Sequence, residues 1–161
     1  MKSKDVIKLL ESNDLIIKKI EHEPLMNMED ASVFNENNDI AKNLLLVDED
    51  KKYYLISIKG DKRISLKTLS LQLDVKKLSF AKEEDMEELL RVTVGSLTPL
   101  ALLNDKKHKV KMYIDDKYKK SDIGVHPLVN TCTVWLEGRK LVNLLKENKV
   151  EVHYINLEKI L

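Results

Sequence analysis

Helix-like and strand-like segments are interleaved along this chain, and that order limits the folds it can adopt. Apolar runs at residues 44–47 and 53–58 are separated only by a charged turn, and they predict a β-hairpin. Stretches with leucines on one face lie between such runs and predict amphipathic helices. Segments in this order favour a mixed sheet in an α/β or α+β domain over a doubly wound parallel sheet.

Hydrophobic periodicity and local breakers assign the individual segments. We expect helices over the opening residues up to Asn13, over 28–35, after an N-cap at Ser65, over 82–90 and over 140–146. We expect strands over residues 15–20, 44–47, 53–58, 78–80, 110–114, 131–136 and 150–157, and a loop over 35–39 that leads to Lys42.

The composition is that of a globular protein with one domain. The 161 residues are 43% hydrophobic and 34% charged, and neither an internal repeat nor a linker divides them, so residues 1–161 are expected to form a single domain. The N-terminus leads into an amphipathic segment, and no apolar run approaches the length that spans a membrane. A soluble, cytoplasmic protein without membrane contact is therefore expected.

Charge, cysteine and histidine usage argue against a globally basic nucleic-acid-binding surface, a cysteine nucleophile and a metal site. The 28 basic and 27 acidic residues leave a net charge of +1, so any contact with nucleic acid must come from a local basic patch. Cys132 is the only cysteine and lies among β-branched residues, which favours a buried packing thiol over a nucleophile. The four histidines are far apart in the sequence. No metal site and no cofactor are expected.

A turn at Gly95, Ser96, Leu97, Thr98 and Pro99 is the most suggestive local motif. A glycine, two hydroxyl residues and a closing proline can form a tight turn whose backbone N–H groups converge on an anion or oxyanion. The alternative is a plain connection between a helix and the next apolar segment, because glycine and proline occur in turns everywhere. By itself the pattern favours the plain turn.

Two further segments have functional and structural interpretations. Lys42 stands between a polar loop and an apolar strand, either as an ammonium at the mouth of a pocket or as a solvated lysine. His126 precedes a proline, which favours an extended backbone, and it either lines a pocket or lies on a surface loop. Asn130 follows closely and either contacts a ligand or satisfies the turn.

Three segments taken together resemble the prolyl-tRNA-editing family of YbaK/ProX-like aminoacyl-tRNA deacylases, and the resemblance extends from the upstream segment at His22 to the terminal strand. The three occur in family order and at family-like separations. They are Ala41-Lys42-Asn43-Leu44-Leu45-Leu46, Gly95-Ser96-Leu97-Thr98-Pro99-Leu100-Ala101-Leu102-Leu103-Asn104-Asp105 and His126-Pro127-Leu128-Val129-Asn130.

The resemblance implies a compact fold around a curved mixed sheet and hydrolysis of the ester that joins an amino acid to the 3′ end of tRNA. The family lysine falls on Lys42, and the family G-x-x-x-P loop falls on Gly95 and Pro99. The cysteine-clearing branch usually lacks both the L-x-N-D continuation and the H-P-L-x-N segment. This chain has both, so it looks like the branch that clears alanine from tRNA(Pro).

On this basis we expect a site in which the Lys42 ammonium anchors the tRNA end and a water molecule attacks the ester. The partners expected are the acceptor end of tRNA(Pro) carrying a small amino acid and, as a second candidate, prolyl-tRNA synthetase. The backbone N–H groups of Gly95, Ser96, Leu97 and Thr98 are expected to hold the oxyanion, and Asn43, Pro99, His126 and Asn130 to contact the substrate.

Other interpretations remain open at this point. Ala41, Leu45 and the run Thr131-Cys132-Thr133-Val134 depart from the family pattern, and they could reshape the amino-acid pocket. The substrate could be another misacylated tRNA such as Cys-tRNA(Pro), or the domain could sense aminoacyl-tRNA or an amino acid without catalysis. The lysine-rich runs at 106–109 and 117–120 are candidate phosphate contacts, although solvated charge runs are more common.

Overall fold

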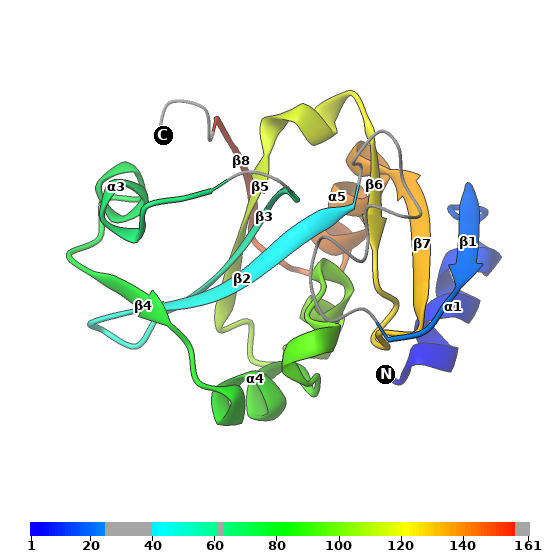
Figure 1. Ribbon diagram of the computed structural model, residues 1–161, viewed down its shortest axis with the longest axis horizontal. Coiled ribbons are helices and arrows are strands. Elements are labelled where there is room, and N and C mark those ends of the chain that lie inside the picture. Colours follow the sequence, from blue (N-terminus) through cyan, green and yellow to red (C-terminus); the bar gives the residue numbers. More distant parts are fainter. Residues whose placement is uncertain (25–39, 61–62, 157–161) are drawn as a thin grey trace.

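Two β-sheets carry the fold in the computed structural model, which describes residues 1–24, 40–60 and 63–156 (Figure 1). The larger sheet has the strand order β4-β2-β3-β5-β8, and the smaller has the order β1-β7-β6. The strands are β1 (Lys18–Glu21), β2 (Ala41–Asp48), β3 (Tyr53–Lys59), β4 (Leu78–Phe80), β5 (Val110–Asp115), β6 (Asp122–Val125), β7 (Cys132–Glu137) and β8 (Val152–Ile155).

Helices join and cover these strands. In the order of the chain they are α1 (Ser3–Ser12), α3 (Leu66–Gln72), α4 (Glu83–Leu90) and α5 (Gly138–Glu147), with 3₁₀ helices η2 (Val94–Ser96), η3 (Pro99–Asn104) and η4 (Asp116–Lys119). Ser65 caps α3 as expected, since its hydroxyl oxygen accepts the N–H of Thr68 at 3.3 Å. The mixed α/β architecture predicted from the sequence is confirmed.

The larger sheet is mixed, because β4, β2 and β3 pair antiparallel whereas β3, β5 and β8 pair parallel. β2 and β3 form the expected antiparallel hairpin, in which Asn43 pairs with Ser57 and Val47 pairs with Tyr53. β5 and β8 then run parallel to β3. The other edge of β2 pairs with β4 only over residues 46–48, so the described chain places no strand beside the start of β2 on that edge apart from a single bridge at Ile40.

The bridge between Ile40 and Gly124 is where the two sheets meet. A Cβ added to Gly124 would lie 2.7 Å from Nε1 of Trp135 and 3.0 Å from Cγ1 of Ile40. Real Cβ atoms do not approach other atoms that closely, so the close packing at this junction requires a glycine. The junction brings the end of β6, and the loop that follows it, next to the start of β2 (Figure 1).

The larger sheet buries both faces. One face carries Leu46, Ile56 and Ile58 and packs against Leu69 of α3. The opposite face contributes to a larger core together with the apolar sides of α1, α4, η3 and α5. Because adjacent side chains on a strand point to opposite faces, each residue of β2 and β3 belongs to one of these two environments. This alternation determines which functional side chains can meet.

Most predicted segments lie close to the observed ones, and two differences are informative. The first strand begins at Lys18 rather than at residue 15, although pairing already starts where the Ile17 N–H donates to the carbonyl oxygen of Trp135 at 2.8 Å. The strand β6 and the 3₁₀ helices were not predicted. β6, η2 and η4 have only three or four residues, too few to show a periodicity, and the six residues of η3 follow the turn as one mostly apolar run. The expected helix at 28–35, the loop at 35–39 and residue 157 lie outside the described residues.

Within the described ranges, no helix is long and apolar enough to cross a membrane.

Candidate active site

Asn43 connects the hairpin to the turn at residues 95–99. Its side-chain nitrogen Nδ2 donates to the carbonyl oxygen of Leu97 at 3.4 Å, and its oxygen Oδ1 accepts a short hydrogen bond from the hydroxyl of Ser57. Ser57 is fully buried and lies directly opposite Asn43 in the β2–β3 register. Both polar ends of the Asn43 amide are therefore engaged, and the amide is held in one orientation. Sequence reasoning missed Ser57, because one serine in an apolar strand carries no motif.

Lys42 projects from the other face of β2. It pairs with Ile58, so it shares a face with the side chains that pack toward α3, whereas Asn43 faces the turn. The side chain is half-buried, and among the residues the structure describes none forms an ion pair or hydrogen bond with its ammonium. The structure thus brings Asn43, but not Lys42, into contact with the turn. Lys42 lies where β4 leaves the edge of β2 uncovered.

The turn itself is built from η2 and the start of η3. The Ser96 N–H donates to the carbonyl oxygen of Thr93 at 3.0 Å, so it is not free for a ligand. Thr98 is fully buried, and its hydroxyl oxygen accepts the Leu100 N–H at 3.3 Å, which caps η3 ahead of Pro99.

These bonds change the donor set expected from the sequence. Ser96 and Thr98 shape the turn, whereas Gly95 is exposed and Leu97 lies just below the surface. η2 spans Val94–Ser96, so Gly95 lies before the first N–H that its i→i+3 pattern uses, and the Gly95 N–H has no partner within that helix. Of the four backbone donors expected from the sequence, the exposed Gly95 N–H is the one best placed to meet an oxyanion.

The L-x-N-D continuation, residues 102–105, anchors the end of η3 and so holds the turn that precedes this helix. Asn104 donates from Nδ2 to the carbonyl oxygen of Leu90 at 3.1 Å, which joins the end of η3 to the end of α4. The Asp105 carboxylate accepts the N–H groups of Lys109 and Val110 at 3.1 Å and 2.8 Å. Both side chains are buried and make structural hydrogen bonds, so this part of the motif positions the turn without facing a substrate.

The loop between β6 and β7 brings Asn130 to the turn. An added Cβ on Gly95 would lie 3.2 Å from Nδ2 of Asn130, so the asparagine amide packs against the glycine. Leu128, within the same loop, has a φ of 66°, a left-handed conformation that is unusual for leucine. The sharp reversal at Leu128 allows Asn130 to point back toward η2.

His126 starts this loop and is a neutral hydrogen-bond donor. Its Nδ1 lies 3.0 Å from the carbonyl oxygen of Cys132, an atom that can only accept, so Nδ1 carries the proton. Burial lowers the pKa of His126; the bond to Cys132 acts in the opposite direction, and nearby His22 lowers it further. At neutral pH Nε2 is therefore an acceptor, and the ring can shape a pocket without supplying positive charge.

His22 lies beside His126, and sequence reasoning assigned it no role. Its ring centroid lies 6.1 Å from that of His126, and its Nε2 is 2.8 Å from the hydroxyl of the buried Thr133. Its Nδ1 lies 2.8 Å from the carbonyl oxygen of Glu23, so the ring is held on both sides. The available signal was the position of His22 in the upstream segment of the family resemblance.

Cys132 behaves as the sequence indicated. Its side chain is 5% exposed, and burial raises the pKa of its thiol, so a reactive thiolate is disfavoured. Among the described residues no group of three or more His, Cys, Asp or Glu side chains is arranged to hold a metal ion. The arrangement offers a backbone N–H donor, an amide, a neutral imidazole and an ammonium that has no partner among the described residues.

The lysine-rich runs at 106–109 and 117–120 differ in how far they are exposed. Tyr118 is fully buried, and its neighbour Lys119 lies over the ring of Tyr154, with its ammonium 4.9 Å from the ring centroid. Much of the 117–120 run thus serves packing, whereas the 106–109 run is exposed.

Comparison with protein families and relatives agrees with the geometry. Residues 22–144 match the model of the aminoacyl-tRNA editing domain. The chain is 36% identical over 133 residues to the prolyl-tRNA editing protein ProX of Acetoanaerobium sticklandii, covering 80% of this chain and 81% of that protein. It is 30% identical to the prolyl-tRNA synthetase associated domain-containing protein 1 of Danio rerio, covering 81% of this chain and 73% of the relative.

Solved structures share the fold. A candidate trans-editing enzyme for prolyl tRNA synthetase superposes with a TM-score of 0.72 at 20% identity, covering 96% of each chain. The hypothetical protein APE2540 superposes with a TM-score of 0.70 at 17% identity, covering 91% of this chain and 95% of that one.

Proposed function

The chain belongs to the aminoacyl-tRNA editing domain family, and on this premise we propose that it is a trans-editing hydrolase that removes alanine from mischarged tRNA(Pro). Hydrolysis of the aminoacyl ester is the reaction of the family, and its relative ProX is a prolyl-tRNA editing protein. The observation that carries the proposal is the convergence of three separate segments at one turn. Asn43 bonds to Leu97, and Asn130 packs on Gly95.

The turn would supply electrostatic stabilisation to the reaction. Water attacks the ester carbonyl, the carbonyl oxygen becomes an oxyanion, and the intermediate collapses to alanine and the free 3′-hydroxyl of the tRNA. The N–H of Gly95 is the leading donor for the oxyanion, and one such donor typically contributes about 3 kcal/mol. Asn43 holds the Leu97 carbonyl and so keeps the peptide groups of the turn in fixed orientation.

Lys42 would act on the tRNA end from the other face of β2. Its ammonium has no partner among the described residues and lies where the strand edge is uncovered. A terminal ribose or phosphate placed along this edge can reach Lys42 while the ester reaches the turn. Lysine serves such a role as a compact point charge on a flexible stem.

Selection among amino acids would depend mainly on size. The Asn130 amide packs on Gly95 and would form one wall together with neutral His126, and the β6–β7 loop contributes no charged side chain. A wall of fixed side chains excludes a larger group by steric overlap. This is more decisive than the roughly 1–3 kcal/mol that one methylene contributes by attraction. Alanine would fit where proline is excluded.

The direct test is deacylation of Ala-tRNA(Pro), Cys-tRNA(Pro) and Pro-tRNA(Pro) by the wild type and by Lys42→Ala. We expect rapid release of alanine, slow release of cysteine, retention of proline, and loss of activity in the variant. Preference for cysteine would reassign the substrate within the same chemistry. If all three tRNAs stay intact while one of them binds tightly, the domain is a non-catalytic sensor of aminoacyl-tRNA.

A further inference from the structure

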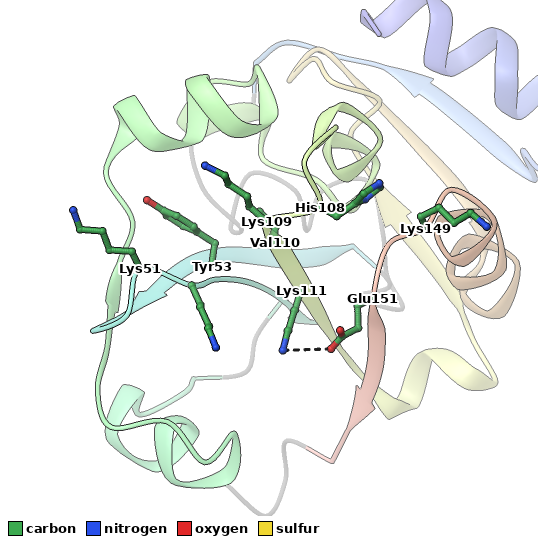
Figure 2. Close-up of a pocket in the computed structure, with 9 residues that line it drawn as sticks. Lys51, Tyr53, His108, Lys109, Val110, Lys111, Lys149 and Glu151 are labelled. Atoms are coloured by element: carbon green, nitrogen blue, oxygen red, sulfur yellow. Dashed lines mark ion pairs between the residues drawn. The ribbon is translucent and has the colours of Figure 1, made fainter.

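The parallel arrangement of β3, β5 and β8 gathers lysines at the end of the larger sheet where these three strands begin. Tyr53 is level with Val110, and Met112 is level with Val152, so the loops that precede the three strands lie side by side. They surround a hollow of about 590 Å³ (Figure 2). We call this cavity the basic hollow, because its lining includes the basic residues Lys51, Lys52, His108, Lys109, Lys111 and Lys149.

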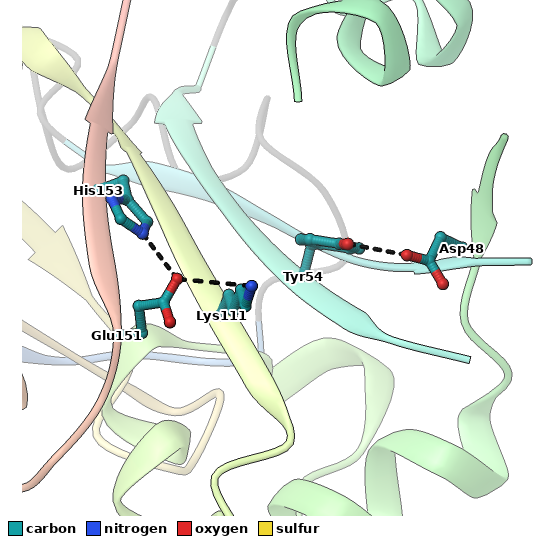
Figure 3. Close-up of polar contacts among 5 residues, drawn as sticks. All are labelled: Asp48, Tyr54, Lys111, Glu151 and His153. Carbon is teal, nitrogen blue, oxygen red and sulfur yellow. Dashed lines mark hydrogen bonds and ion pairs between the residues drawn. The ribbon is translucent and has the colours of Figure 1, made fainter. Parts of the chain in front are cut away.

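The basic hollow has a large excess of positive charge in a chain whose net charge is +1. Its one acidic lining residue is Glu151, which lies 3.7 Å from the ammonium of Lys111 and 2.7 Å from Nε2 of His153 (Figure 3). Glu151 is thus already engaged. In the described part of the chain, the ammonium groups of Lys51, Lys109 and Lys149 have no ion pair.

Acidic residues beside two of the lining residues offset part of this excess. The Asp48 carboxylate acts electrostatically on Lys52, and its oxygen Oδ2 accepts the hydroxyl of Tyr54 at 2.8 Å (Figure 3). Asp85 hydrogen bonds to the Tyr53 side chain, and Glu88 also acts on that group. Asp48 thus offsets part of the charge of Lys52, and Asp85 lies beside the lining residue Tyr53, so most of the positive charge of the lining is left in excess.

Three of the basic residues adopt a backbone conformation that favours glycine. The φ angles of Lys51, His108 and Lys149 are 60°, 51° and 68°, and each residue lies in one of the three loops that enter the parallel strands. Glycine adopts such angles without the steric penalty that a Cβ brings. Basic side chains thus occupy turn positions where glycine would suit the backbone better, which points to a role for the side chains themselves.

We propose that the basic hollow binds the phosphate backbone of the tRNA whose 3′ end enters the active site. The proposal rests on the proposed function. Tyr53 lies four residues before Ser57 on β3, so the hollow begins about 13 Å from the contact between Ser57 and Asn43. One strand of a duplex carries a phosphate every ~3.4 Å along the axis, and an extended single strand spaces them further apart, so this separation corresponds to at most about four nucleotides. An acceptor end held at the turn would therefore bring its phosphates to the lysines.

The test is binding of unacylated tRNA(Pro) transcript to Lys51→Gly/Lys149→Gly, measured by fluorescence anisotropy between 50 and 200 mM salt. Glycine suits both backbone angles, so the thermal midpoint is expected to equal or exceed that of the wild type. Affinity is expected to fall about tenfold, and the slope of log affinity against log salt to become shallower by about 2. The matched control is Lys4→Ala/Lys8→Ala, which removes two exposed lysines from α1.

A wild-type slope and affinity in the glycine variant would overturn the proposal, and so would an equal loss in the α1 control, which would mean diffuse attraction. A loss confined to the glycine variant supports it. Because the transcript carries no amino acid, this outcome does not depend on hydrolysis. Wild-type protein that binds through the hollow but leaves Ala-tRNA(Pro) intact would refute the proposed function alone. Hydrolysis without a contribution from the hollow would refute this inference alone.

Discussion

Asn130 and Gly95 touch at the centre of the candidate site although 35 positions separate them. A Cβ on Gly95 would lie 3.2 Å from the Asn130 side-chain nitrogen, closer than most side-chain contacts in proteins. Gly95 does not have a positive φ, so the position needs a glycine for space and not for backbone conformation. The contact places the β6–β7 loop against the turn that carries the exposed Gly95 N–H.

Gly95→Ala should displace the Asn130 amide and lower kcat for deacylation on the order of tenfold, because small displacements of positioning groups strongly affect reactive geometry. The unfolding free energy should change by less than about 1 kcal/mol, since the half-exposed Asn130 can move aside. Denaturant melts and single-turnover kinetics would measure both. In an Asn130→Ala background the substitution should no longer affect stability. Unchanged kcat in Gly95→Ala would show that the contact is unimportant.

Lys42→Met retains most of the side-chain volume and removes the charge. Because the ammonium has no partner in the described chain, the melting temperature should change little, whereas kcat/KM should fall about 100-fold or more. Lys67→Met, at an exposed position on α3, is the matched control and should retain wild-type kinetics. Equal kcat/KM for Lys42→Met and the wild type would remove Lys42 from the mechanism.

Ser57→Ala should reduce both stability and turnover. The substitution leaves the side-chain oxygen Oδ1 of Asn43 without its hydrogen-bond donor, which should lower the free energy of unfolding by about 1–3 kcal/mol. It also frees the side-chain amide that holds the Leu97 carbonyl. Ser70→Ala is the control, since that buried hydroxyl bonds to Lys67 within α3, away from the site. Both variants should lose stability in urea melts, but only Ser57→Ala should lower kcat. Equal kcat values would make the Ser57 bond purely structural.

Acid should destabilise the fold through His126. Burial lowers its pKa, so the folded protein resists a proton that the unfolded chain accepts at its ordinary value near 6.5. The contribution to stability is thus complete above about pH 6.5 and is lost as the pH falls through the lower pKa of the folded state. His126→Asn keeps an N–H near the Cys132 carbonyl without titrating, so its melting temperature should fall less between pH 7.5 and 5.5. His153→Asn, on an exposed residue, should leave this fall in place.

Gly138→Ala tests packing against helix propensity. Inside a helix the change would ordinarily stabilise by about 1 kcal/mol. Here the added Cβ would lie 2.2 Å from the carbonyl oxygen of Tyr118, a backbone atom in η4 that cannot turn away. We expect a net loss of about 2 kcal/mol or more in the free energy of unfolding. A variant as stable as the wild type would mean that η4 moves freely relative to α5.

The sequence was sufficient for most of the described segments and for the family. Two apolar runs joined by a charged turn predicted the β2–β3 hairpin, a serine predicted the cap of α3, and the H-P-L-x-N segment marked the loop that holds His126 and Asn130. Those signals are local, because hydrophobic periodicity and capping act over a few neighbouring residues.

Only the tertiary structure decided which of these residues meet. Strand alternation placed Asn43 on the face of the turn and Lys42 on the opposite face, and the register supplied Ser57 as the partner of Asn43. The hydrogen bond from Ser96 to Thr93 reduced the donors of the turn. Parallel pairing of strands far apart in the sequence brought Lys51 and Lys149 to one hollow. Such contacts depend on register and on the way distant chain segments pack, neither of which a local pattern encodes.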